Sequence, residues 1–501
     1  MKRIILSIIM VAVLCINISA CQRPDNTTSK TGTIAKSNQK GETKTEKIGD
    51  DREANKENTE RKEGKQEEKG LDDKQKVSRV DVPKWSEDAV LYEVNIRQYT
   101  KEGTFKAFEE HLPRLKELGV DILWFMPIHP ISEENRKGTL GSYYSVQDYR
   151  DVNPEFGILE EFKDLVDRCH EMGFKVLLDW VGNHTGWDNP WIENKDWYTQ
   201  NAKGEIIHPP STDWTDVADL NYDNQDMCNA MLDAMKFWVE EVGVDGFRAD
   251  YASGVPDDFW EHARSELDRI KPIYMLAEDE GRLSLLDEAF NANYGWELHH
   301  IMNKVAKGQN NARHVAINLQ KTQDIYPQGT YPMNFTSNHD ENSWSGTVYE
   351  RLGDAVETMA VLTFTVPGIP LIYSGQEAGL DKRLEFFEKD EIDWSNLEMQ
   401  EFYRALIILK KQNPALWNGD AGGEIDIIEP PDNNLLVFVR EKDDNKVVVI
   451  MNLSESTITS NVEFGDVAGD YESYFSGEVF TVEERQSLKM NPWEYMVLTS
   501  K

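Results

Sequence analysis

The stretch EMGFKVLLDWVGNH at residues 171–184 contains the unit from which the fold of this chain is built. Residues 171–172 are the last of an amphipathic helix expected over 159–172, and Gly173 stops the helical pattern. Residues 175–180 then form a short, almost wholly apolar strand, and polar residues follow it at once. A nearly continuous apolar strand is typical of a parallel sheet that helices cover on both faces.

The same unit recurs on both sides of this stretch. Further apolar strands are expected at 90–94, 121–126, 244–250, 273–278, 331–336 and 369–373. Helical patterns lie between most of them, including those at 105–118 and 227–242. The number of repeats approaches eight, which favours a (β/α)8 TIM barrel over an open doubly wound sheet.

Two regions depart from this alternation. Residues 185–226, after the third strand, show no clear period and are rich in Trp and Tyr, which indicates a small insert in a barrel spanning 83–418. Residues 419–501 switch to period-two strands, such as 435–439 and 446–450. This pattern predicts a C-terminal antiparallel β-sandwich domain.

The first 20 residues are typical of an export signal. A basic start precedes an apolar run to about Ile16, which is shorter than the ~20 residues that span a membrane. The segment ISAC at 18–21 resembles a bacterial lipobox, in which the signal is removed and the cysteine is lipidated. We therefore predict a signal peptide over 1–20, a lipid on Cys21, and an exported protein anchored to a membrane at the cell surface or in the periplasm. An ordinary signal peptide or an N-terminal membrane helix is the alternative.

Residues 21–82 are predicted to be a disordered, charged tether. Beyond the cysteine they contain no Phe, Trp or Tyr, and almost half of them are charged. Such a segment cannot bury enough apolar surface to offset the entropy of ordering. A coil of this length spans on the order of 45 Å, which would let an anchored domain reach a polymer. A lone charged helix is the alternative.

Composition excludes some classes of function. The net charge of −36 argues against a nucleic-acid partner and disfavours a polyanionic substrate. Four cysteines in 501 residues are too few for a disulfide scaffold. Cys169 and Cys228 fall in helical patterns, and we expect them to be free and buried.

Polar residues gather at the ends of four predicted strands, where the active site of a parallel barrel lies. They are Asp179, Asn183, His184, Arg248, Asp250, Glu278, His339 and Asp340. Arg248 and Asp250 are two apart on a strand and share a face. The guanidinium is expected to lower the pKa of Asp250, which would keep this carboxylate ionised as a nucleophile. Glu278 would serve as general acid if its surroundings raise its pKa.

This set suits cleavage of a glycosidic bond, with one carboxylate attacking the anomeric carbon and another protonating the leaving oxygen. Any one of these residues taken alone could be a barrel-end salt bridge or a helix cap. Four clusters in order at strand ends are hard to explain in that way.

The four motifs resemble those of glycoside hydrolase family 13, the α-amylase family, over about residues 85–500. The resemblance implies that Asp250 is the nucleophile, Glu278 the acid/base and Asp340 the stabiliser of the transition state. It also makes the residues after the third strand the family's domain B. The family retains anomeric configuration, which predicts nucleophile and acid carboxyl groups ~5–5.5 Å apart.

The resemblance also implies the residues that bind the sugar at the cleavage point. His184, Arg248 and His339 match such residues, and Tyr144, within the segment 141–149, matches a ring that stacks on the sugar. Any single tryptophan of the insert is expected to pack locally, although the set would suit stacking on sugars.

The chain departs from the family pattern near a calcium site. Ser253 and Gly254 stand where many α-amylases have Lys-His, and Asn221 stands where an aspartate is usual. Asn183 does match a family calcium ligand. Because Ca²⁺ prefers carboxylate oxygens, we expect no cofactor for the chemistry and do not favour a structural calcium ion.

The predicted function is therefore a retaining hydrolase of α-glucosidic bonds, first of all α-1,4 bonds in starch or maltodextrin. An α-1,6-glucosidase, a cyclodextrin or pullulan hydrolase and a transglycosylase are the enzymatic alternatives. A barrel that only binds glycans is the non-enzymatic one, and the retention of all three carboxylates argues against it.

Overall fold

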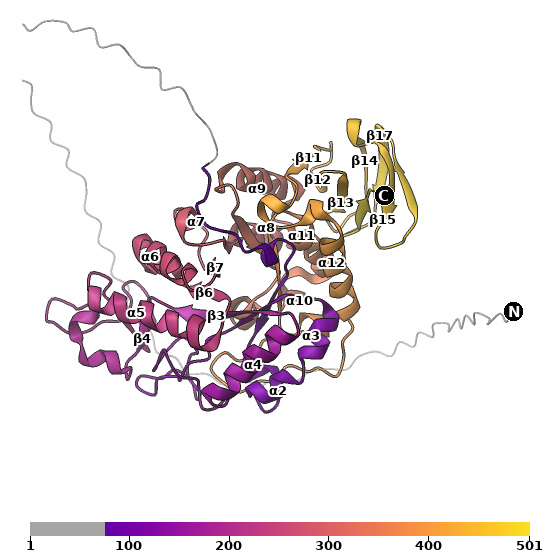
Figure 1. The fold of residues 1–501 in the computed structure, drawn as a ribbon. Coiled ribbons are helices and arrows are strands. Elements are labelled where there is room, and N and C mark those ends of the chain that lie inside the picture. Colours follow the sequence, from indigo (N-terminus) through magenta and orange to yellow (C-terminus); the bar gives the residue numbers. More distant parts are fainter. Residues whose placement is uncertain (1–75, 501) are drawn as a thin grey trace, which may run out of the picture. The chain divides into compact units, whose positions relative to one another are not determined.

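The computed structural model describes residues 76–500. Eight parallel strands close into a barrel, and helices surround it (Figure 1). In order around the ring these strands are β1 (Leu91–Val94), β2 (Ile122–Phe125), β3 (Lys175–Val181), β6 (Gly246–Asp250), β7 (Tyr274–Ala277), β8 (Ala292–Tyr294), β9 (Tyr331–Asn334) and β10 (Ile369–Tyr373). The predicted TIM barrel is confirmed.

Each barrel strand is buried on both faces, as the apolar runs predict. Leu91, Trp124, Leu276 and Met333 belong to a cluster that fills the inside of the barrel. Residues of the opposite parity pack against the surrounding helices in a second, larger cluster. Because side chains alternate along a strand, the inward positions near the carboxyl ends of the strands are free to carry polar groups.

Twelve α-helices are described along this part of the chain. They are α1 (Ile96–Tyr99), α2 (Phe105–Glu109), α3 (Leu112–Leu118), α4 (Leu159–Glu171), α5 (Gln225–Phe237), α6 (Asp257–Asp268), α7 (Leu285–Glu288), α8 (Trp296–Ala306), α9 (Ala312–Ile325), α10 (Val348–Leu352), α11 (Val356–Thr365) and α12 (Gln400–Gln412).

Two of the predicted helices need correction. The helix expected at 105–118 is two helices, because Pro113 has no backbone N–H to donate in a helix interior. Pro113 instead lies in the first turn of α3, where that donor is not needed. The helix expected at 227–242 ends its α-helical bonding at Phe237, and its last turn is π-helical.

The sixth barrel strand, β8, gave no signal in the sequence. It is only three residues long, and Asn293 occupies its centre. It forms because β7 pairs with it on one side and β9 on the other. A polar residue is tolerated there because the Tyr326 hydroxyl donates to the Asn293 side chain at 2.9 Å.

The small insert after the third strand and the C-terminal antiparallel β-domain are both present, as predicted. The insert contains a short antiparallel pair, β4 (His184–Gly186) and β5 (Val217–Asp219). The C-terminal domain has two antiparallel sheets, in the strand orders β11-β12-β13-β18-β15-β16 and β14-β17 (Figure 1). Their strands are β11 (Ile425–Ile427), β12 (Leu435–Lys442), β13 (Asn445–Asn452), β14 (Ile458–Glu463), β15 (Gly469–Ser473), β16 (Val479–Val482), β17 (Arg485–Met490) and β18 (Tyr495–Thr499). The larger sheet packs one face on the smaller sheet and the other on the barrel helices.

The predicted tether is too long at its C-terminal end. Residues 76–82, which were assigned to it, lie against the amino ends of the barrel strands. Ser78 N donates to Gln328 O at 3.2 Å, and the backbone oxygen of Asp81 accepts from Arg264 Nη2 at 2.8 Å. Buried donors on the barrel order this charged segment, which its own composition could not do.

Within residues 76–500, no helix is long and apolar enough to cross a membrane. The predicted signal peptide, Cys21 and the rest of the tether lie outside the described residues. Cys169 and Cys228 are both free, as predicted, but only Cys169 is fully buried.

Candidate active site

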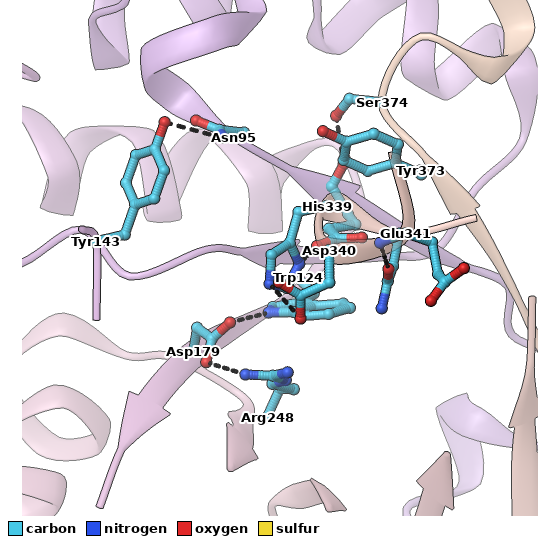
Figure 2. A network of polar contacts seen from close by, with 12 residues as sticks. Asn95, Trp124, Tyr143, Asp179, Arg248, His339, Asp340, Glu341, Tyr373 and Ser374 are labelled. Carbon is cyan, nitrogen blue, oxygen red and sulfur yellow. Dashed lines mark hydrogen bonds and ion pairs between the residues drawn. The ribbon is translucent and has the colours of Figure 1, made fainter. Parts of the chain in front are cut away.

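The predicted catalytic residues converge at the carboxyl ends of the barrel strands. Arg248 and Asp250 end β6, Glu278 directly follows β7, and Asp340 follows β9. Figure 2 shows Asp179 and Arg248 beside Trp124, with His339 and Asp340 next to that ring. Strand order alone therefore brings together residues up to 161 positions apart in the chain.

Arg248 is the centre of this cluster. Its Nη1 lies 2.9 Å from Asp179 Oδ1 and 3.1 Å from Asp250 Oδ1, while its Nη2 lies 3.1 Å from Glu278 Oε2. Its Nε donates to the Tyr294 hydroxyl at 3.0 Å. One fully buried guanidinium thus holds three carboxylates in fixed positions.

Exposure separates the carboxylates into two groups. The side chain of Asp179 is 0% exposed, whereas those of Asp250, Glu278 and Asp340 are 13%, 19% and 37% exposed. A substrate can reach only the last three. Asp179 therefore supports Arg248, and burial raises its pKa to about 6.

The expected lowering of the Asp250 pKa is wrong. Burial and the nearby Glu278 carboxylate raise the pKa of Asp250 well above its ordinary value, although Arg248 opposes this. The sequence showed the adjacent arginine, but burial and the second carboxylate arise only in the folded barrel. Arg248 is thus the group that favours the ionised Asp250 that nucleophilic attack requires.

His339 lies among oxygen atoms. Its Nδ1 hydrogen-bonds Glu93 Oε1, and its Nε2 lies 2.9 Å from the Tyr144 hydroxyl and 3.4 Å from Asp340 Oδ2. Burial lowers the pKa of His339, but the carboxylates of Asp340 and Glu93 outweigh burial and raise that pKa to about 9. His339 is therefore a cation beside the predicted transition-state stabiliser.

His184 is buried at the same mouth, but its pKa is lowered where that of His339 is raised. Its ring hydrogen-bonds the backbone of Tyr144, and burial lowers its pKa to about 4. The ring of Trp214, from the insert, lies 5.7 Å away. His184 is thus a neutral hydrogen-bonding group at neutral pH.

The Tyr144 ring, the predicted sugar platform, stacks at 11° on Phe386 with centroids 6.3 Å apart. Phe386 in turn contacts Trp344, whose side chain is exposed. In the insert, Trp191 packs on Tyr149, in line with the expected local packing, whereas Trp214 reaches Tyr251 beside the site.

Several residues of the site were missed by sequence reasoning. Trp124 was not predicted as a site residue, yet its Nε1 donates to Asp179 Oδ2 at 3.1 Å. Glu93 and Tyr294 were not singled out. Glu93 carried a usable signal, because it is the one charged residue in the otherwise apolar strand 90–94.

The residues at the family's calcium position do not fit the ion. Among residues 76–500, no three His, Cys, Asp or Glu side chains are grouped as a metal site requires. The Asn183 side chain instead hydrogen-bonds Asp219, and its Nδ2 lies 3.3 Å from His184 Nδ1. A Cβ on Gly254 would lie 2.3 Å from Asn183 Oδ1, so the larger residue that α-amylases often have there would not fit.

Comparison with known proteins shows the family to which this chain belongs. A family model described as alpha amylase, catalytic domain, matches residues 63–215 and 210–423, and one described as maltogenic amylase, C-terminal domain, matches residues 425–497. Alpha-amylase MalA of Haloarcula japonica is 27% identical over 78% of this chain, which spans only 60% of that relative's length. The maltogenic alpha-amylase of Bacillus acidopullulyticus is 26% identical over 79% of this chain and 70% of its own.

A solved structure leads to the same conclusion. The noncanonic maltogenic alpha-amylase AmyB from Thermotoga neapolitana superposes with a TM-score of 0.75 at 28% identity, covering 82% of this chain and 98% of that one. This chain therefore belongs to the α-amylase family, glycoside hydrolase family 13, and is a glycoside hydrolase.

Proposed function

We propose that this chain is an exported, lipid-anchored retaining hydrolase that cleaves α-1,4 bonds in starch, maltodextrin or related α-glucans. The observation that carries the chemistry is that Arg248 holds Asp250 and Glu278 side by side. The names of the relatives favour α-glucans as the substrate class. The lipobox-like segment at 18–21 supports lipid anchoring through Cys21.

The proposed reaction is a double displacement. Asp250 attacks the anomeric carbon as Glu278 protonates the leaving oxygen, which gives a covalent glycosyl-enzyme. Glu278 then takes a proton from water, which attacks the same carbon and releases Asp250. Asp340 and the buried Asp179 place negative charge near the oxocarbenium-like transition state, while the cation of Arg248 keeps the carboxylates in position.

The neighbouring groups have supporting roles in this proposal. His184, Arg248 and His339 would hydrogen-bond the sugar at the cleavage point, and the Tyr144 ring would stack on it. The predicted ~5–5.5 Å separation of the two carboxyl groups belongs to the same retaining mechanism.

The test uses a chain starting at Asp72, where the compact unit begins. It is incubated separately with maltoheptaose and isomaltotriose, and NMR follows the products and their anomers. Shorter maltooligosaccharides released first as α-anomers, with isomaltotriose intact, are the expected result. Cleavage of isomaltotriose alone would move the activity to α-1,6 bonds, and longer products would indicate transglycosylation. First-formed β-anomers would overturn the retaining mechanism.

Lipid anchoring has a separate test. Full-length protein expressed with radiolabelled palmitate should carry the label, and Cys21→Ser should lose it. Equal labelling of the variant would overturn Cys21 as the lipidation site.

A further inference from the structure

Glu93 is a buried carboxylate with no assigned role. It lies on β1, and its side chain is 0% exposed. Its Oε1 contacts His339 Nδ1, while its Oε2 has no hydrogen-bond partner among the described residues. Burial of a carboxylate is costly unless it is paired, so the contact with His339 requires an explanation.

The proton on His339 Nε2 follows from a chain of fixed donors. Trp124 Nε1 and Arg248 Nη1 can only donate, so both oxygens of Asp179 accept hydrogen bonds. The Tyr144 hydroxyl also meets Asp179 Oδ2, at 3.1 Å, and gives its single proton to that ionised oxygen. The Tyr144 oxygen must then accept at its other contact, so His339 Nε2 carries a proton.

The proton on Nδ1 follows from Glu93. The contact between Nδ1 and Glu93 Oε1 holds one proton, and a carboxylate, which accepts but cannot donate, would leave that proton on the ring as its second. We propose that Glu93 is a positioning residue that holds His339 as a doubly protonated imidazolium and orients its Nε2–H toward the sugar at the cleavage point. The sugar contact rests on the proposed function, whereas the protonation state does not.

The surroundings of His339 agree with a fixed cation. Glu93 faces it from β1, Asp179 from β3 and Asp340 from its own segment, while Arg248 on β6 is a cation that opposes its charge. The Tyr144 hydroxyl is neutral, because burial and nearby Asp179 raise its pKa well above the ordinary value. The carboxylates outweigh burial and Arg248 and raise the His339 pKa to about 9.

A cation at this position would matter for catalysis. Five carboxylates meet at this barrel mouth, namely Glu93, Asp179, Asp250, Glu278 and Asp340, and Arg248 alone cannot balance them. The imidazolium would add a second cation to this cluster and would donate a strong, charge-assisted hydrogen bond to a sugar hydroxyl.

The experiment compares Glu93→Gln, Glu93→Asp and the control Glu377→Gln in the chain from Asp72. Glu377 is an equally buried carboxylate, but it pairs with Arg114 and Tyr92 on the outer side of β1. NMR of ¹⁵N-histidine-labelled protein reports protonation of both ring nitrogens, and His339→Asn identifies the signals. The pH dependence of kcat/KM on maltoheptaose is the second measurement.

In the unsubstituted chain we expect both His339 nitrogens to be protonated at pH 7.5. Glu93→Gln should lower the pH at which His339 titrates, and the alkaline limb of kcat/KM, below about pH 9, while Asp340 still raises the His339 pKa. At pH 8.5 we expect kcat/KM to fall by up to about tenfold for each pH unit that the limb moves down. Glu93→Asp should recover part of the shift, and Glu377→Gln should lower Tm without moving the limb.

Two results would overturn the proposal. One is a singly protonated His339 at pH 7.5 in the unsubstituted chain, which decides the matter even if Glu93→Gln does not fold. The other is an unchanged His339 titration in Glu93→Gln. The two proposals can fail separately. If the chain cleaves no α-glucan but His339 is doubly protonated, the proposed function is wrong and the role of Glu93 stands.

Discussion

Two buried arginines, one at the barrel mouth and one in the C-terminal domain, have opposite surroundings. Arg248 contacts three carboxylates. Burial lowers its pKa, but Asp179 and Glu278 outweigh burial and raise that pKa. Arg440, on β12, contacts only backbone carbonyls, those of Gly423, Thr365, Val366, Leu416 and Trp417. Burial alone acts on Arg440 and lowers its pKa to about 9.

The partners of a buried cation therefore determine its use. A buried cation with carbonyl partners connects separate segments of the chain. Arg440 connects the end of α11 and residues 416–417 to the C-terminal domain in this way. Carboxylate partners create a charged site that can act on a substrate. The histidines of the mouth repeat the contrast, since His339 faces carboxylates and His184 does not.

The largest effect is expected from Asp250→Asn, which removes the proposed nucleophile at nearly constant shape. Turnover of maltoheptaose should fall by roughly 10⁴-fold or more, because an amide cannot form the glycosyl-enzyme. Thermal unfolding should show a folded protein. Residual activity within tenfold of the original would contradict the assignment of Asp250.

Arg248→Lys should come next. Lysine keeps the charge but cannot contact three carboxylates in one plane. We expect kcat/KM to fall about 10²- to 10³-fold, in the range of losing a preorganised electrostatic contact. Steady-state kinetics and Tm measured on the same sample would separate this loss from unfolding, and unchanged kinetics would remove Arg248 from the catalytic machinery.

His184 allows a test of pH-dependent stability. Burial lowers its pKa from 6.5 to about 4, so between these pH values the unfolded chain binds a proton that the folded chain does not. Stability from this group is present above pH 6.5 and lost as pH falls toward 4, by roughly 3 kcal/mol.

Urea unfolding at pH 7 and pH 4.5 would check this for His184→Gln, which should lose less stability on acidification than the unsubstituted chain. His129, a second buried histidine with a pKa lowered to about 4, provides a positive control as His129→Gln. Parallel curves for all three proteins would show that neither histidine contributes.

Arg440→Lys makes the same arginine-to-lysine change in the C-terminal domain. Lysine cannot reach all five carbonyls, so we expect a loss of about 2 kcal/mol of stability. The value of kcat/KM should stay within twofold. Arg440 contacts Val366, which precedes the amino end of β10, whereas the active site lies at the carboxyl ends of the strands. A catalytic loss as large as that of Arg248→Lys would erase the distinction between the two arginines.

The smallest effect is expected from metal removal. Where α-amylases often hold calcium, Asn183 hydrogen-bonds Asp219 and lies against Gly254. We therefore expect dialysis against EDTA to leave Tm and activity unchanged. A fall in Tm that Ca²⁺ reverses would show that oxygen ligands assemble elsewhere in the chain.

Local sequence signals were sufficient to predict the barrel, the C-terminal sheets and the order of the polar clusters. Strand alternation and helix stops are properties of short segments, and parallel strands place their carboxyl ends at one mouth. Asp179, Arg248, Asp250, Glu278 and Asp340 could therefore be assigned to that mouth from their positions after the apolar strands.

Packing between distant segments accounts for the rest. The strand β8 exists only through its two neighbours, and residues 76–82 are ordered only by donors such as Arg264. The pKa of Asp250 rises because burial outweighs an adjacent arginine. The pKa of His339 rises because Glu93, from a strand 246 residues away, adds its charge to that of the neighbouring Asp340. Burial and long-range electrostatics are properties of the folded chain, so local sequence patterns cannot contain them.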